Sequence, residues 1–176
     1  MIVSDSGGGA REPTPTGAIG AVCSNVYDLG MQPGFDPGTF AHKVVVMWEL
    51  NETLKEGEFA GKRFTISQTF TASLNDKANL CKVLESWRGI PFTAQEKRGF
   101  DLDKIIGKPC MLNIVPKARA NGEMGTAVAA VMPLPKGMEV MTPELPRSFV
   151  PKWVQKILAA PAEQKEPEFK DDLIPF

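Results

Sequence analysis

The stretch that decides the fold is KRFTISQTFTASLNDKANLCKVLESW, residues 62–87. Its first half alternates between apolar and polar residues, so Phe64 and Ile66 share one face, because successive side chains of a strand point to opposite sides. Its second half places apolar residues three or four positions apart, the spacing of a helix that Asn75 or Asp76 can cap. The chain therefore runs from a half-buried strand directly into an amphipathic helix.

Four further segments have the composition of strands, two before this stretch and two after it. They cover residues 18–29, 43–50, 110–115 and 126–134. Short helical turns are expected at residues 93–99 and 101–106, the first with Thr93 and Glu96 at the spacing of a capping box. The order of elements is three strands, a helical insert and two strands.

This order is that of the OB-fold, a partly open β-barrel of five strands. A β-sandwich fragment or an SH3-like barrel shares parts of the order, and the helix between the third and fourth strands favours the OB-fold. We expect a mainly β protein whose OB-fold barrel, with this helical insert, occupies residues 17–138.

Composition divides the rest of the chain into three parts. Residues 1–16, with three consecutive glycines followed by prolines and threonines, predict a flexible leader. Residues 139–160 hold several prolines and then a short helix with an apolar stripe, which we expect to pack on the barrel or on a neighbouring subunit; a partner-binding helix is the alternative. Residues 161–176 predict a flexible acidic tail. They carry five acidic and two basic side chains, a charge of −3. Because the whole chain has a net charge of −1, residues 1–160 carry +2.

The residue counts argue against several kinds of site. His42 is the single histidine, which disfavours His-rich metal centres and catalysis by Ser/His or Cys/His pairs. The three cysteines are far apart and predict buried free thiols in a reducing cytoplasm: Cys23, Cys81 and Cys110. No apolar run approaches the roughly 20 residues of a membrane span, and the first residues lack the pattern of a signal peptide. We therefore expect a cytoplasmic protein that is not an enzyme and uses neither metal nor cofactor.

The last six residues form a distinct motif. They are Asp171, Asp172, Leu173, Ile174, Pro175 and Phe176. This motif resembles the C-terminal tip of bacterial single-stranded DNA-binding proteins, which ends in acidic residues followed by Ile-Pro-Phe and docks onto replication and repair enzymes. An acidic pair suits a basic rim, and a terminal phenylalanine offers a pocket both a ring and a carboxylate. The resemblance implies partner docking through these six residues; a tail that only increases solubility is the alternative.

Six segments of the body show a second resemblance. They cover residues 27–30, 42–50, 61–74, 77–92, 100–115 and 132–137. They are similar to a family of phage- and prophage-encoded OB-fold single-stranded DNA-binding proteins. The resemblance implies binding of single-stranded DNA during replication or recombination in a bacterial host cell.

Binding of unpaired strands requires cations for phosphates and flat side chains for bases. In OB-folds the middle strands and the loops after the first and fourth strands form the ligand face. Cations and polar groups expected there are Lys43, Lys62, Arg63, Thr65, Lys117 and Arg119. Because these cations are few, we expect moderate affinity that depends on stacking as well as on charge.

Position along the chain leaves two roles open for the aromatic candidates, contact with DNA or packing in the core. Tyr27 precedes a glycine-rich loop and either stacks on a base or packs in the core. Trp48 shares with Val44 and Val46 the face of the strand that points inward, so a core position is favoured over a DNA contact. Phe35 and Phe40 flank the first connecting loop and either pack or stack.

Two other classes of function compete with DNA binding. The first is an OB-fold adaptor or scaffold that binds proteins without affinity for single strands. The second is a metal-dependent nuclease using Asp101 with Asp103 or Glu49 with Glu52, although helix capping explains Asp101 more simply. A homo-oligomer is compatible with the sequence.

Overall fold

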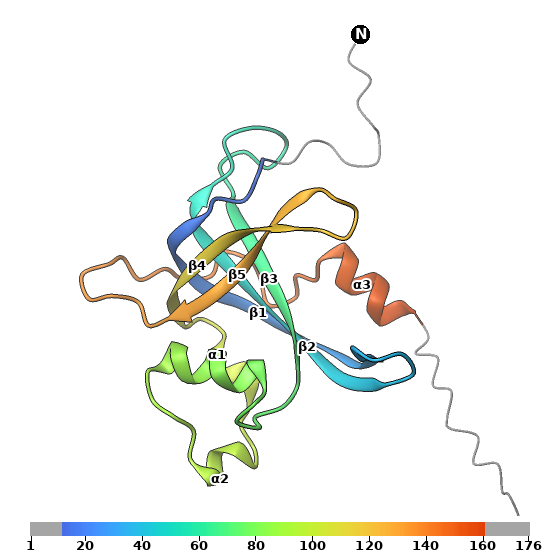
Figure 1. Ribbon diagram of the computed structural model, residues 1–176. Helices are drawn as coiled ribbons and strands as arrows, with labels where there is room; N and C mark the ends of the chain where they lie inside the picture. Colours follow the sequence, from blue (N-terminus) through green and yellow to red (C-terminus); the bar gives the residue numbers. More distant parts are fainter. Residues whose placement is uncertain (1–11, 161–176) are drawn as a thin grey trace, which may run out of the picture.

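The computed structural model describes residues 12–160. Five strands form one antiparallel sheet in the order β3-β2-β1-β4-β5 (Figure 1). The strands are β1 Gly17–Pro33, β2 Phe40–Thr53, β3 Arg63–Thr71, β4 Pro109–Ala118 and β5 Met124–Met132. A mainly β protein with three strands, a helical insert and two strands is confirmed.

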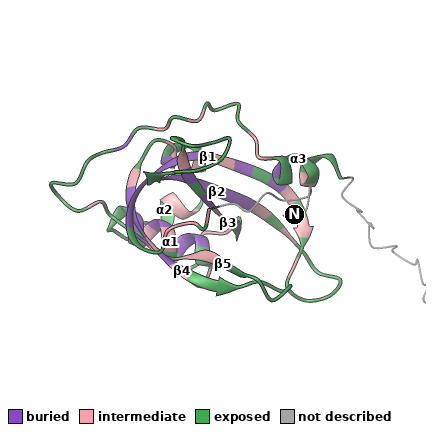
Figure 2. Ribbon diagram, turned by 90° about the horizontal axis from the view of Figure 1, so that it is seen from above, coloured by how far each residue is buried: buried purple, intermediate pink, exposed green. Residues whose placement is uncertain are grey.

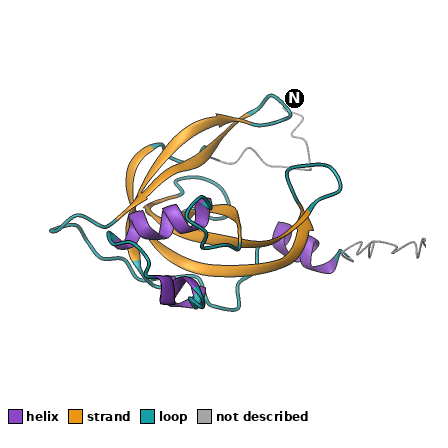
Figure 3. Cartoon of the chain, turned by 60° about the horizontal axis from the view of Figure 1, so that its bottom comes forward, coloured by secondary structure: helices purple, strands orange, loops and turns teal. Residues whose placement is uncertain are grey.

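β1 joins the two halves of the sheet. Its beginning, from Gly17 to Val22, pairs with β4, and from Ala21 onward it pairs with β2. Register shifts after Cys23 and after Asp28 mark irregularities of the kind that bend a strand and increase its twist. The sheet therefore curves around one apolar core (Figure 3).

The two edge strands of the sheet approach each other. Some Cα atoms of β3 and β5 lie within 8 Å of one another, and α1 contacts both strands. Within residues 12–160 the strand pairings join only sheet neighbours, so β3 and β5 are not paired. A cavity of about 320 Å³ lies at this opening, lined by Gln68, Lys82 and residues 128–131 among others.

The helical insert between β3 and β4 covers one end of the core. It consists of α1 Asn79–Arg88, α2 Ala94–Lys97 and the 3-10 helix η1 Leu102–Ile105. The helix start expected at residue 75 or 76 is wrong: the Asn75 side chain accepts from the Lys77 N–H at 3.0 Å in a preceding turn, and Ala78 precedes α1 without a side-chain cap. The capping box of Thr93 and Glu96 is confirmed at α2.

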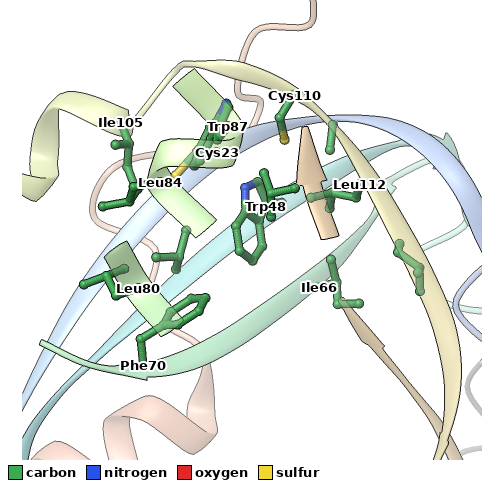
Figure 4. Close-up of a cluster of buried hydrophobic side chains, with 14 of the residues drawn as sticks. Cys23, Trp48, Ile66, Phe70, Leu80, Leu84, Trp87, Ile105, Cys110 and Leu112 are labelled. Atoms are coloured by element: carbon green, nitrogen blue, oxygen red, sulfur yellow. The ribbon is translucent and has the colours of Figure 1, made fainter. Parts of the chain in front are cut away.

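The core is built around two tryptophans. The ring centroids of Trp48 and Trp87 lie 6.1 Å apart, and the Trp87 Nε1–H donates to the Pro109 carbonyl oxygen at 2.9 Å. Figure 4 shows Trp48 between α1 and the sheet, with Leu84 and Leu112 nearby. Buried side chains from the strands and from α1 thus form one continuous apolar cluster.

A second, smaller cluster lies on the outer face of β1 and β2. Its buried members are Tyr27, Leu29, Val45, Met47 and Val154. Val154 belongs to α3 Lys152–Ala159, so this helix packs on the sheet, as its apolar stripe predicted. Figure 2 shows buried residues along β1 and β2 beneath the segment that ends in α3.

Candidate nucleic-acid interface

Two β-hairpins end on the same side of the molecule as α3 (Figures 1 and 3). The β1–β2 hairpin turns at residues 34–39, and the β4–β5 hairpin turns at residues 119–123. Both turns are the connections at which the expected OB-fold would contact its ligand. Groups that contact a nucleic acid are therefore expected at these two turns.

The β1–β2 turn is held by its own hydrogen bonds. The Gly34 N–H donates to the Thr39 carbonyl at 2.7 Å, and Thr39 donates to the Asp36 carbonyl through its N–H at 3.1 Å and its Oγ1 at 2.6 Å. A Cβ at Gly34 would meet Thr39 Oγ1 at 2.5 Å, so this turn needs glycine. Phe35 is fully exposed on the turn and Phe40 is about half exposed. Phe35 therefore does not pack against the protein, and Phe40 is covered only in part.

The β4–β5 hairpin presents two exposed cations. Lys117 lies in β4 and pairs with Gly125 of β5, whereas the sequence placed it in a loop. Arg119 begins the turn, where its N–H donates to the Glu123 carbonyl at 2.8 Å. Both side chains are exposed, so both are available to phosphates.

The outer face of β3 is polar. Lys62 precedes the strand and is exposed, as is Thr65. Lys43 of β2 lies beside the other end of β3, where its Nζ donates to Thr71 Oγ1 at 2.7 Å. This strip presents cations at both ends and hydroxyls between them.

Arg63 faces outward as predicted, but its donors are engaged. Its Nη1 donates to the Thr142 carbonyl at 2.7 Å and lies 3.7 Å from Glu49 Oε1, and its Nε lies 3.3 Å from Glu144 Oε1. These partners hold residues 142–144 against the sheet. Arg63 is therefore a structural cation here and not a free phosphate ligand.

Tyr27 is buried beneath the C-terminal segment. Its hydroxyl donates to the Phe149 carbonyl at 2.5 Å. Burial, with a smaller contribution from Cys23, raises the pKa of Tyr27 from 10.0 to about 12. The ring packs between the sheet and α3 and offers no face to a base.

Trp48 has 0% of its surface exposed and lies in the main core. Its place on the inward face of the strand predicted this position. A fully enclosed indole cannot stack on a nucleotide, so Trp48 does not belong to the interface.

Sequence reasoning missed the structural role of Glu49, which it considered only as a nuclease carboxylate. Only 1% of the surface of Glu49 is exposed, because residues 144–145 cover it. Its carboxylate accepts from the Glu144 N–H at 3.0 and 3.1 Å and from the Leu145 N–H at 3.4 Å. The signal was available: a carboxylate in an otherwise apolar strand requires partners.

The carboxylates proposed for a nuclease do not converge. Asp101 Oδ1 accepts from the Asp103 N–H at 3.0 Å and caps η1. Among residues 12–160, no group of three or more His, Cys, Asp or Glu is placed to hold a metal ion. No helix in the described part of the chain is long and apolar enough to cross a membrane.

The six residues of the tip motif, 171–176, lie outside the described residues. No family model matches this chain, and no curated protein sequence matches it either.

Proposed function

We propose that this protein is a non-enzymatic single-stranded DNA-binding protein whose curved sheet is an OB-fold barrel. The observation that supports this most is the exposure of Phe35 on the hydrogen-bonded β1–β2 turn and of Phe40 beside it, on the side of the molecule where the end of the β4–β5 hairpin, with Lys117 and Arg119, also lies. Aromatic rings that stack on bases, beside cations that contact phosphates, are what binding of unpaired strands requires.

The barrel proposal is supported by the sheet order. β1 pairs with both β2 and β4, the helical insert follows β3, and β3 and β5 lie close together. An OB-fold has five strands in a partly open barrel. The remaining opening between β3 and β5 suits a barrel of that kind.

The proposed interface combines the two hairpin ends with the polar strip along β3. It comprises Phe35, Phe40, Lys43, Lys62, Thr65, Lys117 and Arg119. Base stacking contributes about 1–3 kcal/mol per base, and each phosphate contact releases counterions. Stacking on the two phenylalanines thus accounts for much of the expected affinity.

The resemblance of residues 171–176 to bacterial tips supports a second part of the proposal. The tip recruits replication, recombination or repair enzymes to the bound strand, in the cytoplasm of a bacterial cell that carries the phage or prophage. Copurification of host enzymes with the full chain, but not with an Ile174→Ala/Phe176→Ala variant, tests this part.

Substitution of the exposed rings tests the interface. We expect Phe35→Ala/Phe40→Ala to weaken binding of a fluorescein-labelled oligo-dT by at least about tenfold, because two stacking contacts are lost. Phe59→Ala is the matched control, since Phe59 is an exposed phenylalanine of the β2–β3 loop, and it should leave the affinity within about twofold. Equal effects of the two variants would show that the hairpin rings do not bind bases.

One observation favours the adaptor as a second candidate. Residues 142–160 cover the outer face of β1 and β2, which belongs to the middle strands that commonly bind ligands in OB-folds. An adaptor would use the same fold with that face closed. It would show no binding of oligo-dT at low salt while still capturing enzymes through its tip.

A further inference from the structure

A cavity of about 620 Å³ lies away from both hairpin turns. Its lining residues belong to the helical insert, to the start of β4 and to the chain that leaves β5; Figure 1 shows α1 and α2 of this insert at the lower left. Its apolar lining includes Leu84, Trp87, Phe100, Leu134 and Met138. This size is within the range of pockets that enclose ligands, roughly 300–1,000 Å³.

The rim of this pocket is basic. Lys104, Lys108 and Lys136 line it and are exposed, and they make no ion pair within residues 12–160. Arg88 also lines it but is paired with Glu96, with Nη2 and Oε1 3.1 Å apart. Three lysines without partners around an apolar floor favour a ligand that combines carboxylates with apolar groups.

The floor favours peptide side chains over bases. The Arg88 guanidinium carbon lies 4.6 Å from the centroid of the Phe92 ring, and the Phe100 ring meets Phe92 edge-on with centroids 5.1 Å apart. These contacts occupy the aromatic surface on which a base would stack. The remaining lining includes Pro133, Leu134 and Pro135, which suit aliphatic and aromatic side chains.

We propose that this pocket binds the segment Asp171–Phe176 of a second copy of the protein. The two aspartates complement the lysine rim, and Leu173, Ile174, Pro175 and Phe176 supply apolar groups for the floor. Residues 161–170 separate this segment from α3 and span at most about 35 Å. Because α3 packs on the outer face of β1 and β2, whereas α1, which lines the pocket, packs against the core on the other face, and because the two helices lie on opposite sides in Figure 1, a neighbouring copy delivers the segment more readily than the same chain.

The consequence is head-to-tail association. Each copy offers one pocket and one tip on different parts of its chain, so the contact is heterologous and allows more than two copies to join. It needs no nucleic acid, so it does not depend on the proposed function.

Charge exchange in the full-length protein tests the proposal. Sedimentation velocity without DNA should show self-association that grows with concentration and is weakened at least about tenfold in Lys108→Glu/Lys136→Glu or in Asp171→Lys/Asp172→Lys. Combining the two pairs should restore it, because the charges are then complementary again. Lys55→Glu/Lys152→Glu is the matched control, with two exposed lysines away from the pocket, one on the β2–β3 loop and one on α3.

A peptide titration provides the second measurement. A labelled peptide of residues 166–176 should bind the full-length Ile174→Ala/Phe176→Ala variant, whose own tip cannot compete, and should bind the same protein with Lys108→Glu/Lys136→Glu at least about tenfold more weakly. A peptide that binds both proteins equally, or neither, would overturn the assignment. A wild type that stays monomeric because its own tip closes the pocket would overturn the role of a second copy.

Discussion

At the scale of single residues, Glu49 fixes the C-terminal segment to the sheet. Its buried carboxylate accepts three backbone contacts from residues 144 and 145 and lies 3.7 Å from the Arg63 guanidinium. Such a carboxylate is stable only with partners, because an unpaired buried charge is costly. Glu49 thus anchors the start of the cover over β1 and β2, beside the contacts that Arg63 and Tyr27 make with residues 142–149.

Glu49→Ala should lower the free energy of unfolding by about 2 kcal/mol, since it removes the acceptor for two partly buried N–H groups and a partner of Arg63. Urea denaturation of the full chain measures this loss. Glu52→Ala is the matched control, because Glu52 is an exposed carboxylate of the same strand. Equal stability of the two variants would remove Glu49 as the anchor.

Tyr27 gives a pH-dependent prediction at a single site, because it is the one tyrosine in the chain. Its pKa is raised from 10.0 to about 12, mainly by burial. Folding thus favours the neutral phenol, and stability is lost as pH rises from the unfolded value through the folded one, roughly pH 10 to 12. Absorbance at about 295 nm should show no tyrosinate near pH 10 in the native protein; ionisation there would mean that the ring is exposed.

At the scale of elements, α3 is attached to the sheet by a small apolar contact. Val154 is its buried residue, packed over Tyr27, Leu29, Val45 and Met47. The main core lies on the other face of the sheet and does not include α3. Release of α3 is therefore expected to leave the five strands folded.

Val154→Asp should place a charge in this contact and release α3. Hydrogen exchange is expected to show lost protection in residues 152–159 and retained protection in β1, β2 and β4. Leu158→Asp is the matched control, because Leu158 lies on the same helix with 53% of its surface exposed. Global unfolding of Val154→Asp would show that the cover and the core form one cooperative unit.

Strand existence and order could be predicted from sequence because core-facing residues alternate. The ends of the strands could not be predicted. β1 and β2 continue past the core as a hydrogen-bonded ladder, and there residues such as Met31, Gln32 and His42 do not alternate between apolar and polar. Packing of α3 was predicted from its apolar stripe, but the contacts of residues 142–149 were missed. They use backbone groups such as the Phe149 carbonyl, and side-chain identity says nothing about them. The same cover explains why Tyr27 and Arg63, both candidates for DNA contact, are occupied.

At the scale of the whole molecule, the surfaces are separated. The hairpin ends present exposed rings and cations on one side, the C-terminal segment closes the outer face of β1 and β2, and the basic pocket lies beside the helical insert. The proposed DNA interface and the proposed tip pocket therefore lie on different parts of the chain. We expect occupation of one site to leave the other accessible.

The most direct test of the central claim is a titration of fluorescein-labelled oligo-dT with the full-length protein, followed by anisotropy at increasing salt. We expect saturable binding at low ionic strength and a slope of log K against log salt of about −3, from roughly four phosphate contacts at about 0.7 each. Absence of binding at low ionic strength would contradict the account and leave the adaptor as the function that the structure supports.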